Sequence, residues 1–279
     1  MRYGIKFGVF WLLERLPEKL GDNIYHKLLE INGINRNIDE SITVNLNTIK
    51  YFEKILNSSG GSFKGKTILE IGSGFSPIGP YLFSNEFDTS EVLTFDIGEH
   101  YTAKSIELLN RKFNVNTTNG TLPENVKYFP KSTIKDVSNI SEVDIVYSRN
   151  VLEHIPEPQL FDLHYHLKKE LPPGALVLHQ ISPSDHRSFT DENIGLLDFL
   201  QYNNAEWRKR VTRFDYHNRL RLPQFLNIFK SVGFNILNLK YSKTEDYKIL
   251  PKVISKEFTR FTKEELFAGN IRIVMQNKN

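Results

Sequence analysis

Between residues 66 and 181, short apolar runs alternate with stretches of helical spacing, and this alternation restricts the fold more than any other feature of the chain. The apolar runs are residues 66–71, 91–96, 126–129, 143–147 and 175–181. The last two runs are apolar enough to be buried on both faces, as parallel strands are. The stretches between the runs carry apolar side chains three or four positions apart, which is typical of amphipathic helices. Strands that alternate with helices predict βαβ units around a parallel sheet, with right-handed crossovers.

The flanking segments complete this plan. The N-terminal part has helical spacing and no strand signal, so we predict a helical cap over residues 1–62. A main domain follows over residues 63–279, and within it residues 182–222 break the alternation with polar, aromatic and basic side chains, which predicts an insert. Strand candidates at 234–239 and 271–276 close the chain. We therefore predict a doubly wound α/β fold with a mostly parallel, seven-stranded sheet.

Composition excludes several classes of protein. The chain has no cysteine, which rules out disulfides, thiolate catalysis and cysteine-based metal sites. Its net charge of +3 is too small to indicate a nucleic-acid partner by itself. No segment approaches the roughly 20 apolar residues of a membrane span. We expect a cytoplasmic protein, and we leave open whether the N-terminal helix touches a membrane surface.

A glycine turn at residues 68–80 is the most informative local motif. A strand runs into Gly72 and Gly74, and glycine lets the backbone turn sharply and lets a ligand lie directly against it. A dinucleotide-binding motif would have a third glycine at position 77, which is Pro77 here. Glu70 precedes the turn, and its carboxylate would repel a pyrophosphate. The same carboxylate could hold the positively charged amino-acid end of a sulfonium cofactor.

These residues resemble the first motif of the class I S-adenosylmethionine-dependent methyltransferases, which reads acid-x-Gly-x-Gly. The family's second acid ends the next strand and matches Asp96, which would bind the ribose hydroxyls. The stretch 152–154, Leu-Glu-His, is also common in this family. The resemblance implies a Rossmann-like methyltransferase fold, S-adenosyl-L-methionine as cofactor, and the following cofactor contacts: Glu70, Gly72, Ser73, Gly74, Asp96, Ser132, Ser148 and Arg149.

One of these positions departs from the family pattern. The adenine-contacting position after the third strand matches Ser132, where many members have aspartate. Thr133 or Ile134 could supply this contact instead.

The segment after the fifth predicted strand supplies the candidate catalytic residues. We predict that His186 is the general base and that Asp185 orients it and raises its pKa, with His154 as the rival base. A metal site built from His179, Asp185 and His186 is conceivable by residue type. Spacing does not bring these three side chains together, so we predict no metal.

A basic stretch at residues 207–221 is the second candidate site. It holds six lysine and arginine residues against one acid, Asp215, with aromatic residues between them. This pattern predicts an anionic acceptor, since arginine pairs well with phosphate and carboxylate. The candidate substrate-binding residues are His179, Arg213, His217, Arg219 and Arg221. The segment 185–221 also resembles methyltransferases from bacterial surface-polysaccharide gene sets, which implies O-methylation of a sugar or a phosphate-bearing glycan precursor.

Three other functions remain as alternatives. An RNA methyltransferase could use residues 207–221, although no RNA-binding module accompanies them and we do not expect a nucleic-acid partner. A dinucleotide-dependent oxidoreductase or epimerase is disfavoured by Pro77. A protein that binds S-adenosylmethionine without catalysis is the third. The sequence does not determine the oligomeric state.

Overall fold

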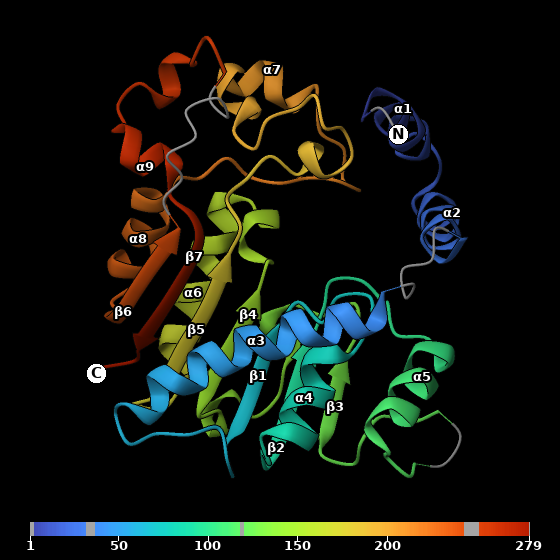
Figure 1. Ribbon diagram of the computed structural model, residues 1–279, viewed down its shortest axis with the longest axis vertical. Helices are drawn as coiled ribbons and strands as arrows, with labels where there is room; N and C mark the ends of the chain where they lie inside the picture. Colours follow the sequence, from blue (N-terminus) through green and yellow to red (C-terminus); the bar gives the residue numbers. More distant parts are fainter. Residues whose placement is uncertain (1–2, 32–36, 118–119, 243–250, 279) are drawn as a thin grey trace.

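The computed structural model describes residues 3–31, 37–117, 120–242 and 251–278. Its centre is a seven-stranded sheet in the order β3-β2-β1-β4-β5-β7-β6 (Figure 1). The strands are β1 Thr67–Ile71, β2 Glu91–Phe95, β3 Val126–Phe129, β4 Ile145–Arg149, β5 Leu176–Ile181, β6 Asn235–Ser242 and β7 Gly269–Gln276. All neighbours pair in parallel except β7, which runs antiparallel to both β5 and β6. The predicted fold class is confirmed.

Helices cover both faces of the sheet, α3 and α4 on one face and α6 and α8 on the other, which makes the fold doubly wound. The α-helices are α1 Tyr3–Leu13, α2 Glu18–Ile31, α3 Ile38–Asn57, α4 Ile78–Glu86, α5 Ala103–Phe113, α6 Glu157–Glu170, α7 Asn204–Arg208, α8 Leu222–Ser231 and α9 Lys263–Phe267. Successive side chains of a strand point to opposite faces. Ile68 therefore packs with the core under α3 and α4, whereas its neighbour Leu69 packs with the core under α6 and α8.

The N-terminal helices occupy two different places. The apolar stripe of α3 is buried at Ile49, Phe52 and Leu56, in the same core as α4 and β1. The pair α1–α2 lies apart from the sheet, beside the segment that follows β5 (Figure 1). There the rings of Phe10 and Tyr25 lie 5.8 Å and 4.8 Å from the ring of Phe214. Hence α3 belongs to the sheet core, and α1–α2 covers the predicted insert.

The predicted insert, residues 182–222, has a small core of its own. Four of its buried side chains pack against residues between β6 and β7, whereas Leu220 and Leu222 at its end join the sheet core under α6 and α8. The members of this core are Leu197, Phe199, Leu200, Trp207, Phe258, Leu266 and Phe267. Among the residues described, no helix has both the length and the apolar character needed to cross a membrane.

Candidate functional site

The glycine turn after β1 presents open main chain. Gly72 and Gly74 have φ values of +77° and +63°, a left-handed conformation that favours glycine. The amides of Gly72 and Ser73 donate to the carbonyl of Phe95, which ties the turn to the end of β2 at 3.0 and 3.1 Å. A Cβ at Gly72 would overlap the side chain of Val151. A Cβ at Gly74 would meet no atom within 4 Å, so a ligand can approach the main chain there.

Asp96 follows β2 and joins this turn to the next loop. Its Oδ2 accepts a hydrogen bond from the Gly74 amide at 3.2 Å, and its Oδ1 accepts one from the Gly98 amide at 2.9 Å. His100 Nε2 lies 3.2 Å from Oδ1. The structure thus brings together two of the predicted cofactor residues, Gly74 and Asp96, because β1 and β2 are neighbours in the sheet.

Glu70 is buried in β1, behind the turn. Burial raises the pKa of its carboxyl to about 8; a hydrogen bond from Thr94 Oγ1, at 2.7 Å, opposes this, and the nearby Asp96 charge adds to it. The carboxyl lies against Gly79 in the first turn of α4, where a methyl group would overlap it. Sequence reasoning missed Gly79. The sequence contained a signal for its role, because Gly79 is a glycine within a helix that packs against the buried acid Glu70.

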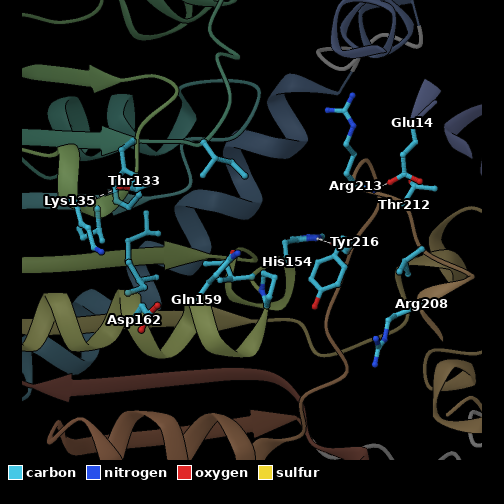
Figure 2. Close-up of a pocket in the computed structure, with 18 residues that line it drawn as sticks. Glu14, Thr133, Lys135, His154, Gln159, Asp162, Arg208, Thr212, Arg213 and Tyr216 are labelled. Atoms are coloured by element: carbon cyan, nitrogen blue, oxygen red, sulfur yellow. Dashed lines mark hydrogen bonds between the residues drawn. The ribbon is translucent and has the colours of Figure 1, made fainter. Parts of the chain in front are cut away.

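A cavity of about 710 Å³ opens beside these loops, at the carboxyl ends of β1 and β2 (Figure 2). Ligands of doubly wound proteins bind at this edge of the sheet. The cavity lies between the sheet, α6, the insert and the end of α1. Its lining residues are Glu14, Ile71, Phe95, Ile97, Thr133, Ile134, Lys135, His154, Ile155, Pro156, Gln159, Asp162, Leu163, Arg208, Val211, Thr212, Arg213 and Tyr216.

None of the predicted cofactor residues lines this cavity, although Ile71, Phe95 and Ile97 beside the two acids and the glycine turn do. The Ser132 amide donates to the Asp96 carbonyl at 2.9 Å, and the next two residues, Thr133 and Ile134, line the cavity. Ser148 is buried at the end of β4 and its Oγ lies 2.7 Å from His179 Nδ1. Arg149 follows it, and its Nε is buried with no hydrogen-bond partner among the residues that the structure describes.

The structure places two of the three predicted catalytic residues side by side. The rings of His154 and His186 have centroids 4.8 Å apart. His154 lines the cavity, and its Nδ1 donates to the Tyr216 carbonyl at 2.8 Å, which leaves the Nε2 lone pair free to accept a proton (Figure 2). His154 reaches this position on the turn between β4 and α6.

Asp185 is held by a different partner. Its carboxylate accepts bidentate hydrogen bonds from Arg187, at 2.9 Å from Nε and 2.6 Å from Nη2. The predicted rise in the pKa of His186 is wrong. Burial, together with the neighbouring His154 and His217, lowers the pKa of His186 to about 3, and the Asp185 charge opposes this only weakly.

The predicted substrate-binding residues separate into buried and cavity-lining groups. Arg219 and Arg221 are buried: Arg219 pairs with Glu257 at 3.1 Å, and Arg221 donates to the Pro183 carbonyl at 2.7 Å. Arg213 lines the cavity and pairs with Asp22 of α2 at 2.7 Å.

The two histidines of this set are buried as well. His179 Nε2 lies 3.1 Å from His164 Nε2, inside the core beneath α6. His217 stacks on His186 with ring centroids 5.0 Å apart. His217 Nε2 also lies 3.5 Å from Asp185 Oδ1. Neither histidine lines the cavity.

Arg208 is a lining residue that sequence reasoning did not single out. Its side chain is exposed at the end of α7 and reaches the cavity (Figure 2). Within the described residues it forms no ion pair. The sequence signal was its membership of the basic stretch, which did not distinguish it from its buried neighbours.

Comparison with known proteins gives structural matches only. Neither the family models nor the curated proteins that were searched contain a match to this chain. Phosphoethanolamine N-methyltransferase 2 of Haemonchus contortus, solved with S-adenosyl-L-methionine, matches 85% of this chain and 53% of its own, with 17% identity and a TM-score of 0.52. A chain in the complex of the Haloferax volcanii Trm112 methyltransferase activator with a protein assigned as a methyltransferase matches over 91% and 98%, with 13% identity and a TM-score of 0.53.

A third structure has the same architecture. A Galdieria sulphuraria protein assigned as a sarcosine dimethylglycine methyltransferase matches 84% of this chain and 86% of its own, with 15% identity and a TM-score of 0.51. At this level of identity the similarity shows the fold, which is that of S-adenosylmethionine-dependent methyltransferases. Activity has to be argued from the site.

Proposed function

We propose that this protein transfers the methyl group of S-adenosyl-L-methionine to a small acceptor. The observation that carries the proposal is the open main chain at Gly74, hydrogen-bonded to Asp96 and flanked by the buried acid Glu70, at one edge of a large cavity. The main chain would receive the methionine end of the cofactor, and Asp96 would accept both ribose hydroxyls. Thr133 and Ile134 line the cavity where the adenine would lie.

The acceptor is an anion that enters beside the insert. Arg208 and Lys135 line the cavity and are exposed, and Arg213, which pairs with Asp22, lines it as well. These cations favour a phosphate- or carboxylate-bearing acceptor, such as a sugar or a phosphate-bearing glycan precursor. The RNA alternative is weaker, because Arg219 and Arg221 are buried and cannot contribute to a basic surface.

The methyl group is transferred to an oxygen of this acceptor. The oxygen attacks the sulfonium methyl carbon, a carbon–oxygen bond forms, the carbon–sulfur bond breaks, and S-adenosylhomocysteine leaves. The proton of the hydroxyl passes to Nε2 of His154, which lines the cavity, while His186 packs against the His154 ring. Asp185 contributes indirectly, since its ion pair with Arg187 holds the loop that carries His186.

Two measurements test this function. Calorimetry with S-adenosyl-L-methionine, S-adenosylhomocysteine and NAD is expected to show binding of the first two only. Methyl transfer from labelled cofactor is then measured into a panel of phosphorylated sugars, uronates and uncharged sugars, and the anionic acceptors should be preferred. Binding of NAD without the sulfonium cofactor would contradict the proposal. A preference for uncharged sugars would contradict the anionic acceptor.

A further inference from the structure

We propose that Glu153, His154 and His186 form a binding site for one divalent transition-metal ion beside the cavity that His154 lines. One carboxylate oxygen and one nitrogen from each imidazole lie within 4.8 Å of one another. Two histidines and one carboxylate, with further positions open, make a donor set that suits Fe²⁺, Mn²⁺ or Zn²⁺.

Within the described part of the chain, two atoms of this cluster are buried without hydrogen-bond partners. Glu153 is 1% exposed; its Oε1 accepts from the Ser182 amide at 3.2 Å, and its Oε2 has no partner. His186 Nε2 has no partner either. An unsatisfied buried carboxylate is costly. Burial raises the pKa of Glu153 to about 8, and the charge of Arg149 opposes this only in part. Within the described residues, Arg149 Nε is itself buried without a hydrogen-bond partner. A cation between Glu153 and His186 would satisfy both free atoms.

One of the two imidazoles is already oriented as metal ligands usually are. A ligating histidine commonly donates its second ring N–H to a carbonyl or carboxylate, which fixes the ring and its tautomer. His154 does so through Nδ1 to the Tyr216 carbonyl, at 2.8 Å. The His186 ring is held by stacking on His217, with ring centroids 5.0 Å apart, and its buried Nε2 has no hydrogen-bond partner among the described residues.

The insert fixes the backbone that carries these ligands. Asn218 donates through Nδ2 to the carbonyls of Leu152 and Ile155, at 2.8 Å each, and through its amide to the carbonyl of Glu153 at 2.6 Å. Metal bonds of about 2.1 Å place ligand atoms roughly 3–4 Å apart. Small side-chain rotations on this fixed backbone would close the present separation.

This set differs from the one that residue type alone indicates. Among His179, Asp185 and His186, His179 is paired with Ser148 and His164, and Asp185 is held by Arg187. Only His186 is left with a free ring nitrogen facing another potential ligand. His154 and Glu153 complete the set from the far side of the cleft, 32 residues or more away in the sequence.

The metal site would also have a role in the reaction, and that role rests on the proposed methyl transfer. A bound cation with an open position would hold the acceptor hydroxyl and lower its pKa, as metals do for bound water. The histidines would then act as ligands, and the proton would pass to solvent water. Binding of the ion itself does not depend on methyl transfer, so the two claims can be separated.

The purified chain is first treated with a chelator, and the chelator is then removed. Co²⁺ is added as the probe. Titration followed by visible absorption and calorimetry should give one Co²⁺ per chain, bound more tightly than Mg²⁺. Glu153→Gln and His186→Gln should each weaken Co²⁺ binding tenfold or more. Glu157→Gln and His166→Gln, on α6 outside the cluster, are matched controls and should leave the affinity unchanged.

Folding is checked by thermal unfolding of every variant without metal. Glu153→Gln should unfold no lower than the parent chain, since glutamine has nearly the same shape, carries no charge and keeps an oxygen acceptor for the Ser182 amide. Equal Co²⁺ affinity in the parent chain and both ligand variants, or no visible Co²⁺ bands, overturns the site. If Co²⁺ does not bind while the cofactor binds and methyl transfer proceeds, the site is wrong and the proposed function stands. If Co²⁺ binds but the cofactor does not, the site stands and the proposed function is wrong.

Discussion

The main-chain amide of Gly74 donates a hydrogen bond to the carboxylate of Asp96 across 3.2 Å, and this contact joins the loops that follow β1 and β2. The same carboxylate accepts from Gly98, so two amides fix its position before any ligand arrives. A carboxylate fixed in this way pays little ordering cost when it accepts two hydroxyl groups. We therefore expect cofactor affinity to depend on Asp96 more than on any other side chain.

Replacing Asp96 with alanine should weaken binding of S-adenosylhomocysteine by about 1–3 kcal/mol, since charge-assisted hydrogen bonds to the ribose are lost. Calorimetry measures this directly. The matched control is Asp39→Ala on α3, where the carboxylate is exposed and pairs with Lys112. Unchanged affinity in Asp96→Ala would remove this residue from the site.

Cofactor binding should release a proton. Burial raises the pKa of Glu70 to about 8, so at pH 7 about nine in ten molecules carry a neutral Glu70. A cationic cofactor nearby favours the ionised form, so Glu70 loses its proton on binding, and affinity should rise with pH up to about 8. Calorimetry in buffers of different ionisation enthalpy measures the proton count, and Glu70→Gln should abolish the buffer dependence. A buffer-independent enthalpy in the parent chain would contradict the prediction.

Gly79→Ala should destabilise the protein by about 1–3 kcal/mol, although alanine normally favours a helix. The reason is the overlap of the new methyl group with the Glu70 carboxyl. Gly8→Ala in α1 is the control, because a Cβ there meets nothing within 4 Å, and it should stabilise slightly. Urea unfolding compares the two. Glu70→Ala in the Gly79→Ala background should recover part of the loss, and equal stability of the two glycine variants would refute the overlap.

Arg208→Ala should raise the KM for an anionic acceptor roughly tenfold and leave thermal stability unchanged, since this exposed side chain lines the cavity and has no ion pair in the described structure. Lys209→Ala is the control, because Lys209 is exposed next to it and does not line the cavity. Steady-state kinetics on both variants gives the comparison. A similar KM in the two variants would place the acceptor elsewhere.

The parts of this structure that depend on local patterns were predictable. The strands β1, β2, β4 and β5 are compact apolar runs, and the turn at Gly72 and Gly74 needs glycine for its backbone conformation. The capping box at Thr262, which starts α9, is likewise a local signal. These features depend on residues that are neighbours in the sequence, so the sequence alone is enough to place them.

The acceptor side was less predictable because its contacts are long-range. In the sequence alone, Arg219 is indistinguishable from a free cation. In the fold, the small core of the insert brings Glu257, 38 residues later, into contact with it. Asp185 and His186 are adjacent in sequence, yet Asp185 caps the short helix at 186–189 and faces Arg187. The His154–His186 pair joins two segments that only the folded sheet places together.

The central claim is best tested by the structure of the protein crystallised with S-adenosylhomocysteine. We predict both ribose hydroxyls within about 2.6–3.2 Å of the Asp96 carboxylate, and the amino-acid tail over the main chain of Gly72 and Gly74. Density for the nucleoside at another edge of the sheet, or an empty cavity at saturating ligand, would contradict the account.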